Sequence, residues 1–415
     1  MNRGNRLFVA SCLALIVTAM SFAIRADIMG ELGQHFSLTH EQVGWVAGTA
    51  FWGFTLAMIF GGPLCDTLGM GRLVTVAFVG HVVGVLVTIF AQGFWTLFLG
   101  TLAIGLANGL VEAACNPLVT ALFPDKKVEK LNQFHVWFPG GIVIGGLAAY
   151  FLAMGNMGWQ VKMAVMLIPT LAYGVMFFGQ KFPQTERVEA GVSTGDMYKA
   201  VLAPIFLVMV FCMLLTASTE LGPNQWIPSI LTTSAGVSGI LVLVWINGLM
   251  AVGREFAGPI VHRISPVVLL LISSFFAAVG LLSLSFAQGG LMTFAAATVF
   301  AVGVCYFWPT MLGVVAERVP KSGALGLAIM GGAGMMSVSW ILPIMGRIYD
   351  AQIKAALPLG ATPEMMPQDI MAQATAEGGA ATLRYVVILP LTLCLIFGAM
   401  YLRDRMKGGY KAEKI

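Results

Sequence analysis

The stretch GGPLCDTLGMGR, residues 61–72, decides the fold of this chain because it is a short polar turn between two long apolar runs. Crossing roughly 30 Å of hydrocarbon takes about 20 apolar residues in a helix. Each flanking run is long enough for one crossing. The stretch therefore predicts two membrane-spanning helices joined on one side of a bilayer.

The composition extends this interpretation to the whole chain. Hydrophobic residues make up 58% of the sequence and charged residues 10%, with a net charge of +4. The apolar runs are continuous rather than alternating, which excludes β-barrel spans, and the charge is too small to indicate a nucleic-acid partner. All six cysteines lie in or beside apolar runs, so we expect neither disulfides nor metal ligands. The sequence predicts an all-α polytopic membrane protein.

Hydropathy predicts about twelve spans in the chain. They lie near residues 7–30, 43–63, 72–92, 95–122, 130–153, 161–181, 200–232, 236–262, 266–287, 290–316, 323–346 and 383–403. If the N-terminus is cytoplasmic, most basic residues near the span ends lie on the cytoplasmic side, which also holds the C-terminus. Four basic residues then lie on the outer side: Lys162, Arg347, Lys354 and Arg384. This asymmetry predicts cytoplasmic termini and a location in the bacterial inner membrane.

The spans divide into two halves that resemble each other. We expect a six-helix bundle over 1–181, a cytoplasmic linker over 182–199, and a second bundle over 200–415 that includes an outer loop, 351–381, and a cytoplasmic tail. Gly-Pro pairs end the second and eighth spans, and Asn-Pro and Trp-Pro occupy matching places in the fourth and tenth. Two repeats of this kind are one architecture of secondary transporters, which bind substrate near the bilayer midplane.

The turn after the second span resembles the signature of the major facilitator superfamily. The residues that match are Gly62, Asp66, Gly69 and Arg72. The resemblance implies the major facilitator fold, with two pseudo-symmetric six-helix bundles. It also implies a gating role for this loop, in which Asp66 bonds helix-end amides or Arg72 and the latch opens during transport.

A closer resemblance covers most of the N-terminal half. Residues 22–28, 36–39, 42–44, 109–117 and 131–132 are similar to the fucose:proton symporter family. In that family the aspartate of the first span and the glutamate of the fourth handle the proton and the sugar. The resemblance implies these proton-coupling roles for Asp27 and Glu112. The chain departs from the family pattern at Arg25 and in the stretch 135–140, which leaves the substrate open.

Polar residues at helical spacing form a stripe on each of three apolar spans. The fourth span carries Asn108, Glu112 and Asn116, the fifth carries Asn132 and His135, and the seventh carries Thr216, Glu220 and Asn224. Spacings of three and four residues place each set on one helix face. Hydrogen bonding between helices explains a single asparagine well. Because two of the three stripes contain a carboxylate, we expect them to line a substrate site.

Arg25 is a charged residue inside an apolar span. It is two residues from Asp27, so the two do not share a helix face. We expect Arg25 either to pair with Glu112 or Glu220, or to bind an anionic group of the substrate. By contrast, Arg254 lies toward the inner end of the eighth span, where a long side chain reaches the interface.

The seventh span contains a proline close to its polar stripe. Pro223 removes a backbone donor, so we expect an interruption whose freed carbonyls line a cavity together with Asn224, Gln225 and Trp226. Amides and an indole suit a neutral polyhydroxylated ligand. A tryptophan near the membrane surface is equally typical of an interfacial anchor.

These features predict a monomeric transporter that works without a cofactor. We expect proton-coupled symport of a small polar solute, a sugar or a sugar-like compound, by alternating access. The sequence leaves three alternatives open: an exporter or antiporter, sodium-coupled uptake, and a transporter-like receptor. No phosphate-binding loop, zinc motif or nucleophile elbow is present, so no enzyme activity is expected.

Overall fold

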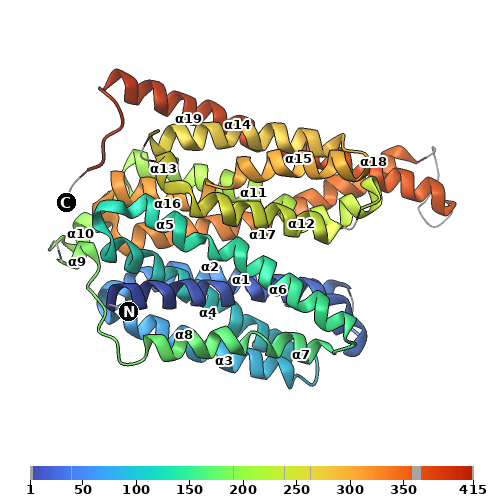
Figure 1. Ribbon diagram of the computed structural model, residues 1–415, viewed down its shortest axis with the longest axis horizontal. Coiled ribbons are helices and arrows are strands. Elements are labelled where there is room, and N and C mark those ends of the chain that lie inside the picture. Colours follow the sequence, from blue (N-terminus) through green and yellow to red (C-terminus); the bar gives the residue numbers. More distant parts are fainter. Residues whose placement is uncertain are drawn as a thin grey trace. The chain divides into compact units, whose positions relative to one another are not determined.

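The computed structural model describes residues 3–38, 40–189, 191–237, 239–261, 263–357 and 366–413, and these residues form helices and connections without a strand (Figure 1). The helices are α1 (Arg3–His35), α2 (His40–Leu68), α3 (Met70–Ile89), α4 (Phe94–Leu122), η1 (Pro124–Lys126), α5 (Lys127–His135), α6 (Trp137–Met154), α7 (Trp159–Ala164), α8 (Leu167–Phe177), α9 (Glu186–Glu189), α10 (Thr194–Val201), α11 (Pro204–Ala235), α12 (Gly239–Glu255), α13 (Ala257–Val261), α14 (Pro266–Ser285), α15 (Gly289–Val304), α16 (Phe307–Arg318), η2 (Pro320–Ser322), α17 (Gly323–Ala356), α18 (Gln368–Val386) and α19 (Ile388–Met406). The all-α prediction is confirmed.

Eleven helical segments of the described chain are long and apolar enough to cross a membrane. The remaining expected span, 236–262, appears as α12 and α13, which a turn at Phe256 separates. Helix α12 alone has 17 residues. The twelve predicted spans thus correspond to eleven long segments and one divided segment.

Prolines explain where the divided spans break. Helices α5 and α6 separate at Val136, three residues before Pro139, and α15 and α16 separate at Cys305 and Tyr306, just before Pro309. A proline has no N–H for the carbonyl four residues earlier, and its ring crowds that carbonyl. Each break therefore leaves a backbone carbonyl available to another group.

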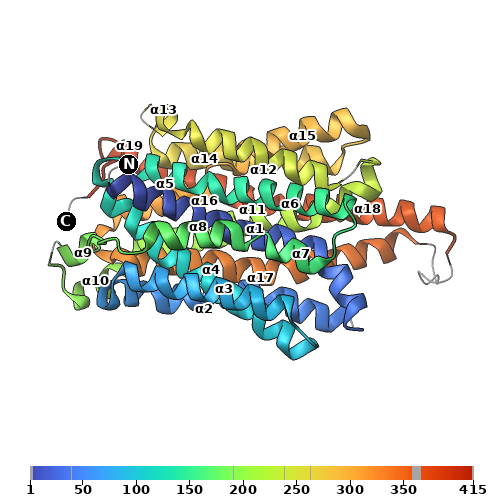
Figure 2. The ribbon, with the colours of Figure 1, turned by 60° about the horizontal axis from the view of Figure 1, so that its bottom comes forward.

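The chain divides by its internal contacts into two compact units. The first contains Met1–Val210, Pro309–Met336 and Lys411–Ile415, and the second contains Phe211–Trp308 and Ser337–Tyr410. Within the first unit, α1 packs against α4, α6 and α8, and these helices run side by side in both views (Figures 1 and 2). Within the second, α14 packs against α15, α18 and α19. The predicted bounds of the two halves stay a prediction.

The segment Pro309–Met336 packs closely onto the first six spans. A Cβ at Gly62 would lie 2.5 Å from the Ala328 Cβ, and a Cβ at Gly313 would lie 2.6 Å from the Val128 Cγ2. The Thr55 hydroxyl donates a hydrogen bond to the Gly332 carbonyl at 3.5 Å. Small residues let backbones approach in membrane helices. Gly62 of α2 and Gly313 of α16 therefore allow this segment to pack closely against the first six spans.

Glycine also allows α2 and α4 to pack backbone to backbone. A Cβ at Gly105 would lie 2.6 Å from the Thr49 carbonyl oxygen. A Cβ at Gly109 would collide with the Phe54 carbonyl oxygen and lie 2.7 Å from the Ala57 Cβ. This contact positions the part of α4 that carries the polar stripe.

Replacing Gly109 by alanine is expected to lower the free energy of unfolding by about 1–3 kcal/mol, because the added methyl group overpacks the α2–α4 contact. Gly398→Ala in α19 is the matched control, since a Cβ at Gly398 would meet nothing within 4 Å. That control is expected to be neutral or to stabilise by up to about 1 kcal/mol. Unfolding of the purified protein in detergent measures both changes, and equal effects would contradict the close packing.

Candidate solute and proton site

A buried cluster of polar side chains joins α4 to α5. The Asn116 Nδ2 donates a hydrogen bond to Glu112 Oε2 at 2.6 Å, and His135 Nε2 lies 3.0 Å from Asn116 Oδ1. The same His135 nitrogen is 3.8 Å from Glu112 Oε2. All three side chains are about 1% exposed. Because the Asn116 oxygen is an acceptor, His135 Nε2 is the donor in this contact.

Asn132 lies one helical turn before His135 and is fully buried. Its Nδ2 donates to the Val128 carbonyl oxygen at 2.9 Å. Its Oδ1 has no hydrogen-bond partner among the described residues. An unsatisfied buried acceptor costs about 1–3 kcal/mol. A hydroxyl or N–H group of a bound solute would satisfy this oxygen.

Asn108 belongs to a different network from the rest of its stripe. Its Nδ2 donates to the Ser21 hydroxyl at 2.9 Å, and its Oδ1 lies 2.8 Å from His81 Nε2. The other His81 nitrogen lies 2.8 Å from the Tyr173 hydroxyl. Protein groups thus engage the amide of Asn108 on both sides. This network holds α1, α3, α4 and α8 together, and the predicted substrate role of Asn108 stays a prediction.

Asp27 differs from Glu112 in its surroundings. Its side chain is 38% exposed and accepts a hydrogen bond from Lys162 Nζ at 2.8 Å. Lys162 also contacts Glu31 at 2.5 Å and is itself buried. Asp27 and Glu31 are four residues apart on one face of α1, so a single ammonium group bridges both.

Arg25 has no ion-pair or hydrogen-bond partner among the described residues, although it is only 8% exposed. Its guanidinium lies over the ring of Phe22, 5.0 Å from the ring centre. The expected pairing with Glu112 or Glu220 is wrong for this structure. Asn116 bonds Glu112, and a different arginine binds Glu220.

That arginine is Arg254, which the sequence interpretation placed near the membrane surface. It is instead 1% exposed, and its Nη2 donates to Glu220 Oε1 at 2.9 Å. Its Nε donates to the Cys305 carbonyl at 2.5 Å. Pro309, four residues later, cannot donate to that carbonyl. The expectation of a surface arginine is therefore wrong, because a buried carboxylate and a freed carbonyl both attract it inward.

The seventh span runs as one helix, α11, through Pro223, so the expected interruption there is not seen. Asn224 is buried and its Oδ1 has no hydrogen-bond partner among the described residues, as is also true of Glu220 Oε2. Gln225 is exposed, and Trp226 packs edge-on against Tyr349 at 5.8 Å. Consecutive residues point about 100° apart on a helix, so these three cannot share one face.

The four residues of the predicted gating motif lie around the one-residue loop that joins α2 to α3. Gly62 and Asp66 belong to the end of α2, Gly69 is the loop itself, and Arg72 lies in the first turn of α3. Gly69 has a φ of 86°, a conformation that favours glycine, and a Cβ there would meet nothing within 4 Å. Gly62 is instead required for packing. Asp66 accepts a hydrogen bond from the Thr185 hydroxyl in the linker at 2.5 Å. Arg72 is exposed and forms no ion pair in the described part of the chain, so it does not latch to Asp66 here.

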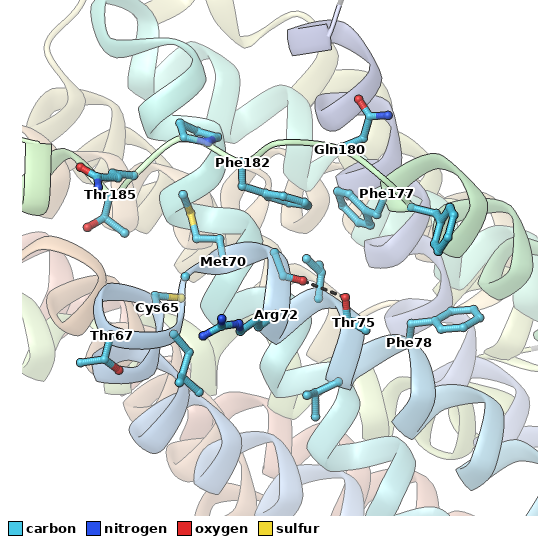
Figure 3. A pocket seen from close by; sticks show the side chains of 18 of the residues that line it. Cys65, Thr67, Met70, Arg72, Thr75, Phe78, Phe177, Gln180, Phe182 and Thr185 are labelled. Atoms are coloured by element: carbon cyan, nitrogen blue, oxygen red, sulfur yellow. Dashed lines mark hydrogen bonds between the residues drawn. The ribbon is translucent and has the colours of Figure 1, made fainter.

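A cavity of about 1140 Å³ opens beside this loop. Figure 3 shows Arg72, Phe78, Phe177 and Phe182 among the side chains that line it, and the Thr75 hydroxyl donates a hydrogen bond to the Gly71 carbonyl at 2.9 Å. The cavity lies where the α2–α3 turn meets the start of the linker. Its lining includes residues of the gating motif and of the linker, and does not include Glu112, Asn116 or His135.

Sequence reasoning missed three groups that the structure shows to be engaged. They are Tyr173 in the core, Lys162 in α7, and Thr185 beside the gating motif. Their partners are more than 90 residues distant in sequence. Spacing within one helix therefore carries no signal for them.

A polytopic helical chain with buried ionisable groups in its spans and a glycine-containing turn between its second and third spans has the features expected of a solute transporter of the membrane. The Major Facilitator Superfamily model matches residues 7–344, and the chain belongs to that family.

Three known proteins show how far the similarity extends. The cis,cis-muconate transport protein of Acinetobacter baylyi is 24% identical over 267 residues, which cover 60% of this chain and 64% of that protein. The Escherichia coli fucose:proton symporter matches 94% of this chain and 99% of its own, with a TM-score of 0.69 and 14% identity. The match to a proton:xylose symporter covers 96% of this chain and 95% of that protein, with a TM-score of 0.79 and 13% identity. At these identities the solved structures show the shared fold.

Proposed function

We propose that this chain imports a small polar solute together with a proton, and that Glu112 takes up the proton. The cluster of Glu112, Asn116 and His135 is the observation that carries the proposal. In its charged form the carboxylate is held by the Asn116 N–H, and in its protonated form it becomes a donor. Because the cluster is buried, switching between these forms changes the packing of α4 against α5.

Solute binding is assigned to the same part of α5. Asn132 Oδ1 lacks a donor among the described residues and lies one turn from His135. A polar solute would supply that donor, and its arrival would couple to the proton on Glu112 through the intervening amide and imidazole. The proposal places the protein in the bacterial inner membrane as a monomer with cytoplasmic termini. Alternating access supplies the transport step.

The similar proteins support transport but divide over the substrate. One is named for cis,cis-muconate, a carboxylate, and two are named for sugars and protons. The direct test is uptake into proteoliposomes under an inward pH gradient, with a sugar and acid panel. Uptake driven by a sodium gradient alone would show that the coupling ion is Na⁺ rather than a proton. Absence of uptake under either gradient would contradict the proposed function.

Asp27→Asn is expected to reduce pH-driven uptake by about 3- to 10-fold, less than a change at Glu112, because Lys162 already pairs with this partly exposed carboxylate. Lys162 would keep Glu31 as its partner. Initial uptake rates measured beside Glu112→Gln decide between the two carboxylates. If Asp27→Asn abolishes uptake while Glu112→Gln retains it, the proton role moves to Asp27.

A further inference from the structure

Three lysine and arginine side chains are buried within the spans that the structure describes. Lys162 contacts Asp27 and Glu31, and Arg254 contacts Glu220. Arg25 is the one of these three that has no carboxylate partner among the described residues. It also donates no hydrogen bond to a described residue. The pattern separates Arg25 from the two basic residues that stabilise the fold.

The ring of Phe22 does not meet the needs of a buried guanidinium. Arginine carries five N–H donors in a planar fork and stays charged in proteins. A ring face attracts the charge but accepts no conventional hydrogen bond. Phe22 itself packs against Phe51 at 5.4 Å and Phe138 at 6.0 Å, so this side of Arg25 is apolar. The guanidinium thus lacks both a countercharge and acceptors among the described residues.

A carboxylate supplies both. Its two oxygens match the guanidinium fork in a bidentate contact, which is stronger than a neutral hydrogen bond. Arginine is favoured over lysine where such planar recognition matters. A neutral sugar offers hydroxyl acceptors but no countercharge, and it would leave the buried charge uncompensated.

We propose that Arg25 binds the carboxylate of the transported solute, so that the substrate is a small organic acid anion. This inference rests on the proposed function, since it names the substrate class of the same transporter. It also fixes the charge that moves in each cycle. One proton with one monocarboxylate carries no net charge, whereas one proton with a neutral sugar carries one positive charge.

Binding to matched pairs of ligands tests the substrate class without any gradient. The pairs are benzoate with benzamide, lactate with lactamide and glucuronate with glucose, measured on the full chain in detergent by thermal shift and equilibrium dialysis. We expect at least one acid to bind and its neutral partner to bind at least about 30-fold more weakly, as for loss of a buried charged contact. Chloride and phosphate serve as inorganic controls.

Variants of Arg25 connect the binding to this residue. Arg25→Gln is expected to lower acid affinity by roughly 30-fold or more, and Arg25→Lys by less, because the charge remains but the fork is lost. Arg3→Gln on the same helix is the control, since Arg3 is exposed and bonds the Lys181 carbonyl. If Arg25→Gln does not fold, Arg25→Lys and the paired ligands on the unaltered protein still decide.

The outcomes separate this inference from the proposed function. Equal binding of acids and neutral partners, an unchanged affinity in Arg25→Gln, binding of inorganic anions alone, or binding of no acid would overturn the role of Arg25. Acid binding without pH-driven uptake would sustain Arg25 and contradict proton symport. For a bound monocarboxylate, we further expect pH-driven uptake that does not change with an imposed membrane potential, and a potential-dependent rate would contradict the charge balance.

Discussion

Glu112→Gln is expected to lower pH-driven uptake by about 100-fold, the scale of a strong coupling between two ligands on one protein. In the unaltered protein Asn116 Nδ2 donates a hydrogen bond to Glu112 Oε2 at 2.6 Å. The glutamine keeps an oxygen that can accept the same hydrogen bond. It cannot take up a proton, so a proton gradient no longer drives the solute. Binding and exchange of solute across the membrane without a gradient should be retained.

The control for this change is Glu377→Gln, an exposed glutamate of α18 that accepts a hydrogen bond from Gln373. It should transport like the unaltered protein. Initial rates under a pH gradient and exchange rates at equal pH are measured on the same preparations. If the Glu112→Gln protein accumulates solute to the same level as the control, Glu112 does not couple the proton to the solute.

The buried pair in the second unit should produce the largest change in stability. Removing either Glu220 or Arg254 leaves an uncompensated buried charge, which costs about 3–5 kcal/mol. Arg254 also satisfies the Cys305 carbonyl that Pro309 leaves open. We therefore expect Glu220→Leu and Arg254→Met each to lower the free energy of unfolding by about this amount.

The double variant Glu220→Leu with Arg254→Met should recover most of the loss, because apolar residues often replace a buried pair at little cost. Lys126→Met is the control, since the Lys126–Glu129 pair spans 3.7 Å with Lys126 57% exposed and should be worth about 0–1 kcal/mol. Chemical unfolding in detergent gives all four values. Single variants no less stable than the control would show that the pair does not stabilise the fold.

The fold could largely be predicted from the sequence, because the thickness of the hydrocarbon layer sets the length of each span. Hydropathy did not predict the breaks between α5 and α6 or between α15 and α16, although Pro139 and Pro309 explain them, since each proline follows a break within four residues. Pro223 shows the limit of that rule. It lies within the continuous helix α11, where neighbouring helices can satisfy or cover the carbonyl that it frees.

The candidate site could be predicted from the sequence only where its residues lie on the same helix or on adjacent helices. The spacing of Glu112 and Asn116 predicted one face, and the structure places both beside His135. Pairing between distant helices depends on depth and rotation, which the sequence does not specify. That is why Arg254 was missed as the partner of Glu220, although both are ionisable residues in apolar spans.

Proton entry with the solute tests the central claim most directly. Proteoliposomes that enclose a pH-sensitive dye are given a solute that binds the unaltered protein, with no gradient imposed beforehand. Solute addition should acidify the interior of vesicles that contain the unaltered protein, and should leave the pH unchanged with Glu112→Gln. Solute entry without acidification, or equal acidification by both proteins, would contradict proton coupling through Glu112.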